Sequence, residues 1–155
     1  MKRTPKRLAL CLCLLTVNLA VIWGSSLMDA EKSSAFSGFV GNLISSLFPA
    51  ADAGQGGTGH GLLRKLGHFT EFCSLGLLLT WLVGMVMNGK WQVFVLPLAA
   101  GILVACLDET IQLFVPGRAG QITDVGIDTL GCALGIVLIN VRKQIKIKLL
   151  EETKQ

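Results

Sequence analysis

Ionisable side chains interrupt three long apolar runs of this sequence. They are Lys65, His68, Glu71, Asp108, Glu109, Asp124 and Asp128. A charge at the centre of a bilayer costs about 2.5–3.5 kcal/mol even on the mildest scales, so such residues usually face a protein interior and take part in function. Imidazole and carboxyl groups can donate and accept protons in catalysis. The candidate catalytic residues are therefore His68, Glu71, Asp108 and Glu109.

Other polar residues in or beside the same runs could bind a ligand. The candidate binding residues are Lys65, Gln112, Arg118, Asp124 and Asp128. Lys65 and Arg118 could clamp a phosphate or a carboxylate, because the guanidinium fork suits bidentate contact. No residue is assigned to a metal, and the sequence does not identify a cofactor. As a variant, His68 with two or three carboxylates could hold one divalent ion, whereas a single histidine at this spacing argues against a two-metal centre.

The composition of the 155-residue chain indicates a membrane protein. Hydrophobic residues make up 52% of it and charged residues 15%, and the mean hydropathy is +0.62. A soluble domain usually has about 25% charged residues, so this chain has too little polar surface for a water-facing globule. The net charge of +4 is concentrated at the two ends beside apolar runs. We expect the lipid bilayer to be the partner there, and no nucleic acid.

Four apolar runs are long enough to cross a bilayer and predict an all-α membrane protein, with about four transmembrane helices in a compact bundle. The predicted spans are residues 8–28, 66–87, 91–115 and 122–141, within a single membrane domain of residues 1–155. Each is close to the ~20 residues that a spanning helix needs. The alternative for the first run is a cleaved signal peptide, which Asn18 and the lack of a small-x-small cleavage site disfavour.

The distribution of lysine and arginine predicts the direction of each span. The N-terminus and the tail 142–155 are expected in the cytoplasm, and the connection 29–65 outside, in a multi-pass protein of the cytoplasmic membrane. Basic residues in the outer loops, such as Arg64, Lys65 and Arg118, oppose this direction but are outnumbered by those at the two termini. Within the first outer loop, apolar residues of 36–48 recur at helical spacing. They predict a short amphipathic helix lying in the interface, or one packed against the bundle.

Depth and helical face both predict that the carboxylates converge. At about 1.5 Å per residue, Glu71, Asp108 and Asp128 each lie roughly 7–10 Å inside the outer end of their own span. At 100° per residue, His68 and Glu71 share one face, and Asp128 shares one with the small residues Gly131 and Gly135. Glu109 points about 100° away from Asp108 and is expected to have a different neighbour.

The same residues carry a resemblance to a known family. Lys65-x-x-His68-x-x-Glu71-Phe72, then Asp108-Glu109-x-x-Gln112-x-Phe114-x-Pro116-Gly117-Arg118, then Asp124 with Gly131 and Gly135, resemble the VanZ-like family. The resemblance covers residues 65–135. It departs from the family at Asp128, where many members are expected to have asparagine. The family takes its name from a membrane protein associated with low-level teicoplanin resistance, so the resemblance implies a bacterial cell-envelope protein that affects glycopeptide susceptibility.

Three classes of function remain open from the sequence. The favoured one is an outward-facing polar pocket that binds or modifies an envelope molecule, such as a lipid-linked precursor or a lipid headgroup. The second is a structural role, in which the charges form a buried ion-pair network. The third is a small transporter that acts as an oligomer, since membrane carboxylates can relay protons. The sequence does not fix the oligomeric state or show whether a reaction occurs.

Overall fold

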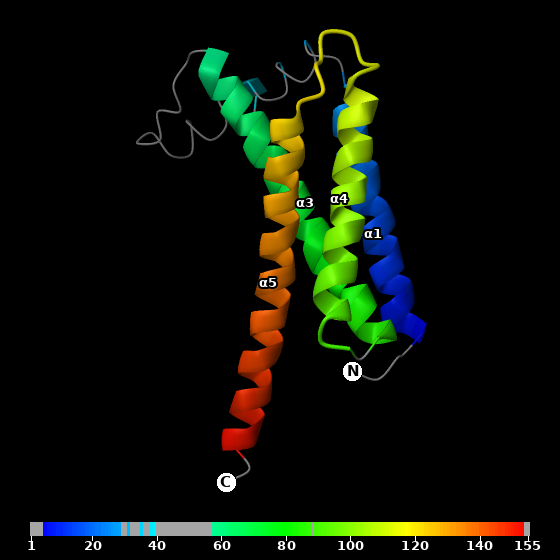
Figure 1. Ribbon diagram of the computed structural model, residues 1–155, viewed down its shortest axis with the longest axis vertical. Helices are drawn as coiled ribbons and strands as arrows, with labels where there is room; N and C mark the ends of the chain where they lie inside the picture. The colour runs from blue at the N-terminus through cyan, green and yellow to red at the C-terminus, as the bar shows by residue number, and fades with distance from the viewer. Residues whose placement is uncertain are drawn as a thin grey trace.

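The computed structural model describes residues 5–28, 31, 35, 38–39, 57–87 and 89–153. Its helices are α1 (Pro5–Ser26), α3 (Gly57–Val86), α4 (Gln92–Gln112) and α5 (Ile122–Glu152). They lie side by side as a bundle of long helices (Figure 1). All the secondary structure in the described part of the chain is helical, which confirms the predicted fold class. The amphipathic helix predicted at residues 36–48 falls largely outside the described residues.

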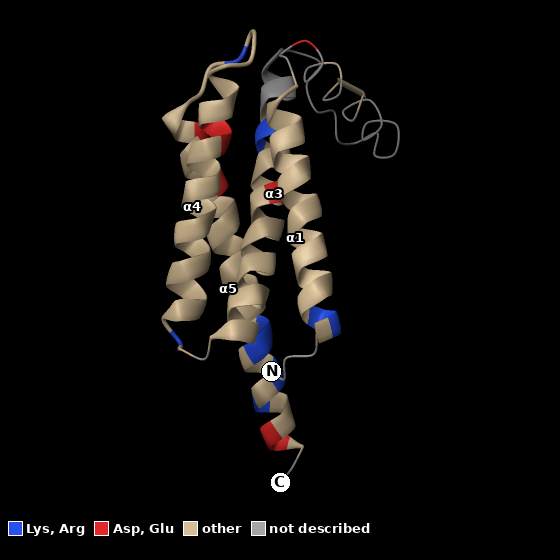
Figure 2. Cartoon of the chain, turned by 90° about the vertical axis from the view of Figure 1, so that its right-hand side faces the viewer, with Lys and Arg blue, Asp and Glu red and all other residues tan. Residues whose placement is uncertain are grey.

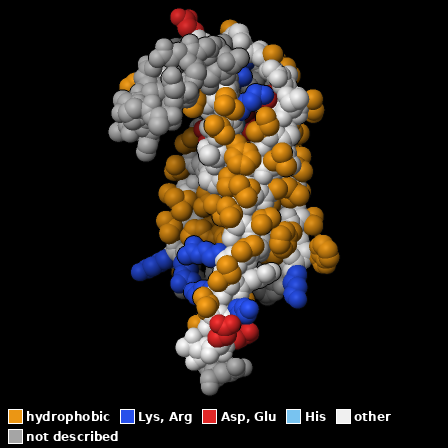
Figure 3. All heavy atoms as spheres, turned by 90° about the vertical axis from the view of Figure 1, so that its left-hand side faces the viewer, with side chains coloured by type: hydrophobic (Ala, Val, Ile, Leu, Met, Phe, Trp, Pro, Cys, Tyr) orange, Lys and Arg blue, Asp and Glu red, His pale blue; other side chains and the backbone are white. Residues whose placement is uncertain are grey.

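All four helices are long and apolar enough to cross a membrane. Their outward faces carry apolar side chains that are half or more exposed in the isolated chain, including Leu10, Val17, Val95, Leu103 and Leu130. Figure 3 shows one face of the bundle, on which apolar side chains form a broad surface between the two ends. Such a surface is suited to lipid rather than water. The chain is a multi-pass membrane protein whose environment is a lipid bilayer.

Three helix ends in the structure differ from the ends of the predicted spans. The helix α3 begins at Gly57 rather than at residue 66, so the end of the predicted connection 29–65 is helical. The helix α5 continues through 142–152, which had been predicted as a tail. A fall in hydropathy indicates where contact with lipid ends, but a helix can continue beyond that point. Residues 142–152 contain no glycine or proline that would end the helix. Conversely, α4 ends at Gln112, shortly before Pro116, because the residue preceding a proline disfavours helical geometry.

The helix α3 is central and contacts the other three, most extensively α5. Glycines allow this close approach. A Cβ atom on Gly131 would collide with the backbone carbonyl of Phe69, and one on Gly135 with that of Cys73. From the other side, a Cβ on Gly76 would collide with the carbonyl of Cys132. The predicted role of Gly131 and Gly135 in helix packing is confirmed, and their backbone-to-backbone contact brings the polar side chains of α3 and α5 together.

The two ends of the bundle differ in charge. The start of α1 and the end of α5 lie at one end, which carries basic residues including Arg7, Lys90 and Arg142 (Figure 2). The opposite end holds the acidic positions of α3 and α4 and those at the start of α5, together with basic ones, whereas Glu151 and Glu152 lie at the far end of α5 (Figure 2). We call this second end the site end. It is defined by Glu71, Asp108, Glu109, Asp124 and Asp128.

Candidate functional site

Asp108 lies at the centre of the polar contacts at the site end. Its side chain is fully buried, and its Oδ2 accepts hydrogen bonds from Ser26 Oγ at 2.7 Å and from Gln112 Nε2 at 3.0 Å. His68 Nδ1 lies 3.8 Å from the same oxygen. Ser26 belongs to the last turn of α1, His68 to α3, and Gln112 to α4 itself. One carboxylate thus links three helices of the bundle.

Lys65 and Asp124 form an ion pair between α3 and α5. Lys65 Nζ donates to Asp124 Oδ1 at 2.8 Å, with the lysine side chain 37% and the aspartate side chain 15% exposed. The pair lies beside a small pocket lined by Arg64, Lys65, His68, Gln112, Asp124, Ile127 and Asp128. The volume open to the centre of a water molecule is about 10 Å³, which is room for about one water-sized occupant. The pocket therefore admits one small group between basic and acidic side chains.

Glu71 faces His68 and the end of α1. Its Oε2 lies 3.9 Å from His68 Nδ1 and accepts a long hydrogen bond of 3.4 Å from Ser25 Oγ. One helical turn further along α3, Ser74 donates to the backbone carbonyl of Glu71 and contacts Asn18 of α1. Asn18, whose polarity interrupts the apolar first run, thus forms part of the contact between α1 and α3.

Glu109 is directed away from the pocket. It is buried, and its Oε2 accepts the backbone N–H of Gln121 at 2.7 Å, while Gln112 Nε2 lies 3.3 Å from its other oxygen. Gln121 is the residue immediately before α5. A carboxylate is favourable beside the N-terminus of a helix, where backbone N–H groups lack helical partners. The different neighbour expected for Glu109 is therefore the start of α5, and its geometry is that of a positioning residue.

Arg118 reaches the site end through a tight turn. Arg118 N donates to Val115 O at 3.1 Å, and Gly117 between them has φ 75°. Proline at the second position and a positive-φ glycine at the third are the signature of a type II turn. The turn directs Arg118 to α1, where its Nη2 donates to the carbonyl of Ser25 at 3.0 Å. Arg118 is absent from the residues that line the described pocket.

The positive φ of Gly117 leads to a testable prediction. We expect Gly117→Ala to lower the stability of the folded protein by about 1–2 kcal/mol, because a side chain disfavours left-handed backbone geometry. Gly24→Ala is the matched control, since a Cβ at exposed Gly24 meets nothing within 4 Å. Thermal unfolding in detergent measures both variants. An unfolding temperature for Gly117→Ala equal to that of the control would contradict this account of the turn.

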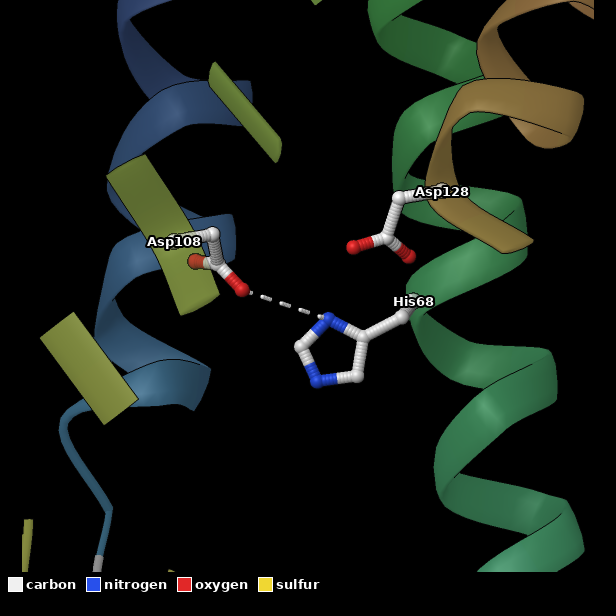
Figure 4. A group of neighbouring side chains, drawn as sticks. All are labelled: His68, Asp108 and Asp128. Carbon is white, nitrogen blue, oxygen red and sulfur yellow. Dashed lines mark ion pairs between the residues drawn. The ribbon is translucent and has the colours of Figure 1, made fainter. Parts of the chain in front are cut away.

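His68, Asp108 and Asp128 approach one another from α3, α4 and α5. Figure 4 shows both carboxylates directed toward the Nδ1 side of the imidazole ring. One ligand atom from each residue lies within 4.8 Å of the others. The site end therefore contains two buried carboxylates and a partly buried imidazole beside the Lys65–Asp124 pair.

The structure thus brings His68, Glu71, Asp108 and Asp128 together, and it adds residues that the sequence did not assign to the site. Arg64 lines the pocket and shares a helical face with His68. Ser25 and Ser26 contact the carboxylates of α3 and α4. Ser25 and Ser26 belong to no periodic pattern in the sequence. Only their position near the outer end of the predicted span 8–28 could have indicated that they contact the site.

Comparison with known families identifies the chain's relatives. A family model described as VanZ/LLP1 matches residues 9–143. The chain belongs to the VanZ/LLP1 family. Comparison with curated proteins and with solved structures finds no match.

The VanZ/LLP1 match includes every residue of the candidate site. It begins within α1 and ends within α5, so it also includes the two α1 serines that contact Glu71 and Asp108. The motif blocks that resemble VanZ-like proteins are separated in sequence but meet in space, at the site end. In this VanZ/LLP1 member, Asp128 adds a second carboxylate beside Asp108, at the position where the resemblance leads us to expect asparagine in many members.

Proposed function

We propose that the protein lies in the bacterial cytoplasmic membrane with both termini in the cytoplasm, and that its site end faces outward and binds or modifies an anionic envelope molecule. The observation that carries this proposal is the pocket, in which Arg64 and Lys65 lie beside His68, Gln112 and Asp128. The chemical class of the ligand is a lipid-linked precursor or a lipid headgroup with a phosphate or carboxylate. The basic residues at the opposite end support the orientation, because positive charge favours the cytoplasmic side.

The size of the pocket limits how such a molecule would bind. Space for about one water-sized group admits only the charged group of a ligand, so the apolar part would remain in the surrounding lipid. Lys65 is 37% exposed and can turn from Asp124 toward an incoming anion, with Arg64 beside it. His68 would donate or accept a proton, with Glu71 or Asp108 as its partner. Gln112, Asp124 and Asp128 would contact the bound group, and Arg118 would hold the edge of the site against α1.

The test scores protein level and phenotype together. Wild type and the variants His68→Ala, Asp108→Asn and Arg118→Ala are expressed in a glycopeptide-susceptible bacterium, and membrane level and teicoplanin susceptibility are measured. We expect wild type to change susceptibility, and each variant to lose the effect at normal membrane level. Thr70→Ala is the control, because Thr70 is exposed on α3 between His68 and Glu71 and bonds only its own helix among the described contacts. Normal expression with an intact phenotype in all three variants would refute the proposal.

A charge swap separates this proposal from a purely structural ion-pair network. Lys65→Asp places two carboxylates together and is expected to lower stability by about 1 kcal/mol, a modest effect because the pair is partly exposed. The double variant Lys65→Asp/Asp124→Lys is expected to recover the thermal stability. It should not recover the phenotype, because the cation now extends from α5 instead of α3. Recovery of both properties would favour the structural network.

A further inference from the structure

Two buried carboxylates at the site end lack the hydrogen bonds that buried anions normally have. Asp128 is 1% exposed, and neither of its oxygens accepts a hydrogen bond from any described residue. The Oδ1 atom of fully buried Asp108 also has no such partner. Burial of a charged group is strongly unfavourable unless it is paired or bound to a metal. A proton or a bound cation would satisfy these atoms.

The neighbouring basic residues do not supply enough positive charge. The helices α3, α4 and α5 contribute five carboxyl groups to the site end, those of Glu71, Asp108, Glu109, Asp124 and Asp128, and the permanent cations beside them are Arg64, Lys65 and Arg118. Lys65 is paired with Asp124, and Arg118 donates to a backbone carbonyl of α1. If all five carboxyl groups are ionised and the imidazole is neutral, these residues carry an excess of two negative charges, which one divalent cation would balance.

The distances within the group favour an ion over a direct hydrogen bond. His68 Nδ1 and Asp108 Oδ2 are 3.8 Å apart, too far for a hydrogen bond. In tetrahedral coordination, two ligands of one ion that are each bonded at about 2.0–2.2 Å lie roughly 3.3–3.6 Å apart. One atom each of His68, Asp108 and Asp128 lies within 4.8 Å of the others. Three such atoms fit within about 2.8 Å of a common centre, so an inward movement of each by roughly 0.7 Å would bring all three onto one ion. Figure 4 shows the three side chains converging from different helices.

We propose that His68, Asp108 and Asp128 bind one divalent first-row metal ion such as Zn²⁺ or Mn²⁺. The ligands are His68 Nδ1 and one oxygen of each aspartate. A mixed set of imidazole and carboxylates favours such ions over Mg²⁺ and Ca²⁺, which prefer oxygen ligands alone. Ser26 and Gln112 hold the Asp108 carboxylate by hydrogen bonds, the kind of support that metal ligands usually have.

The inference deepens the proposed function, on which its biological meaning rests. Three protein ligands leave coordination positions open, and the pocket beside them is lined by Arg64 and Lys65. A phosphate or carboxylate that entered this pocket could contact the ion and the two basic side chains together. Metal binding is nevertheless measurable without any envelope ligand, so the two proposals can fail separately.

The test uses the full chain purified in detergent and stripped with a chelator. Zn²⁺, Mn²⁺ or Mg²⁺ is added, and bound metal and thermal stability are measured. We expect about one Zn²⁺ or Mn²⁺ per chain at the site, a raised unfolding temperature, and weaker binding of Mg²⁺. Exposed Cys13 and Cys106 could add background Zn²⁺, which Mn²⁺ largely avoids because thiolates favour softer ions.

Matched variants assign the metal to this site. Asp128→Asn and His68→Gln are each expected to weaken Mn²⁺ binding at least ~10-fold. Metal-free Asp128→Asn should unfold at the same temperature as wild type or higher, because it removes an uncompensated buried charge. Thr70→Ala is the control and should retain the metal, since Thr70 is exposed and bonds only its own helix among the described contacts. The inference is overturned if wild type binds no stoichiometric Zn²⁺ or Mn²⁺, or if both ligand variants bind as tightly as wild type. Normal metal binding without any susceptibility phenotype would refute only the proposed function.

Discussion

Gly135→Val is expected to disrupt the packing of α3 against α5 and to lower the stability of the folded protein by at least about 3 kcal/mol, beyond the usual cost of overpacking. The first added carbon alone would collide with the carbonyl of Cys73 and lie 2.9 Å from the amide nitrogen of Leu77. Both are backbone atoms, so no rotamer change can relieve the collision. The two helices would have to separate, which would also separate Lys65 from Asp124.

Gly126→Val is the matched control for this prediction. Gly126 belongs to the same helix, and a Cβ there meets nothing within 4 Å, so the same chemical change should alter stability by no more than about 0.5 kcal/mol. Both variants are purified in the same detergent, and the unfolding temperature and the yield of monodisperse protein are compared with wild type. Equal behaviour of the two variants would show that the glycine contact between α3 and α5 does not stabilise the protein.

The second large effect concerns Asp108. Asp108→Ala should lower the stability of the metal-free protein by about 2–4 kcal/mol, because it leaves a small cavity and removes the acceptor of two buried donors. Those donors are the Ser26 hydroxyl and the Gln112 amide. Asp108→Asn keeps one oxygen that can accept both bonds, and it also lowers the repulsion with Asp128. We therefore expect it to unfold close to the wild-type temperature.

A double-mutant cycle tests the link between Asp108 and α1. Ser26→Ala alone should be destabilising, but in the Asp108→Ala background it should cost little more, because its partner is already gone. Thermal unfolding of the four proteins, all stripped of metal, gives the coupling energy. Strictly additive effects would indicate that the Ser26–Asp108 hydrogen bond does not contribute to the docking of α1.

Much of the bundle could be predicted because lipid imposes simple constraints on a sequence. A spanning helix needs a long apolar run, and such runs are readily recognised. The common depth of Glu71, Asp108 and Asp128 followed from the same spans, as did the direction of Glu109 away from Asp108. Close packing at Gly131 and Gly135 was likewise predicted from their position on the polar face of the last run.

The remaining features depend on contacts that have no repeating pattern. Ser25 and Ser26 reach the site only because α1 ends beside α4, and helix neighbours are not encoded in hydropathy. Lys65 pairs with Asp124, which lies on another helix. The sequence contains several carboxylates at a similar depth and does not indicate which of them pairs with Lys65. The helix α5 extends beyond the predicted span 122–141. Its last turns are rich in charged residues, which favour helix but have low hydropathy.

The extended end of α5 determines where the protein can adapt to its membrane. With 31 residues at about 1.5 Å each, this helix is roughly 46 Å long, against a hydrocarbon thickness of about 30 Å. The excess lies at the end with Arg142, Lys146 and Lys148, long side chains that can extend toward the headgroups from several depths. In bilayers of different thickness, we expect these basic turns of α5 to shift their position in the headgroup region. The carboxylates of the site end would then stay at a constant distance from the membrane surface nearest to them.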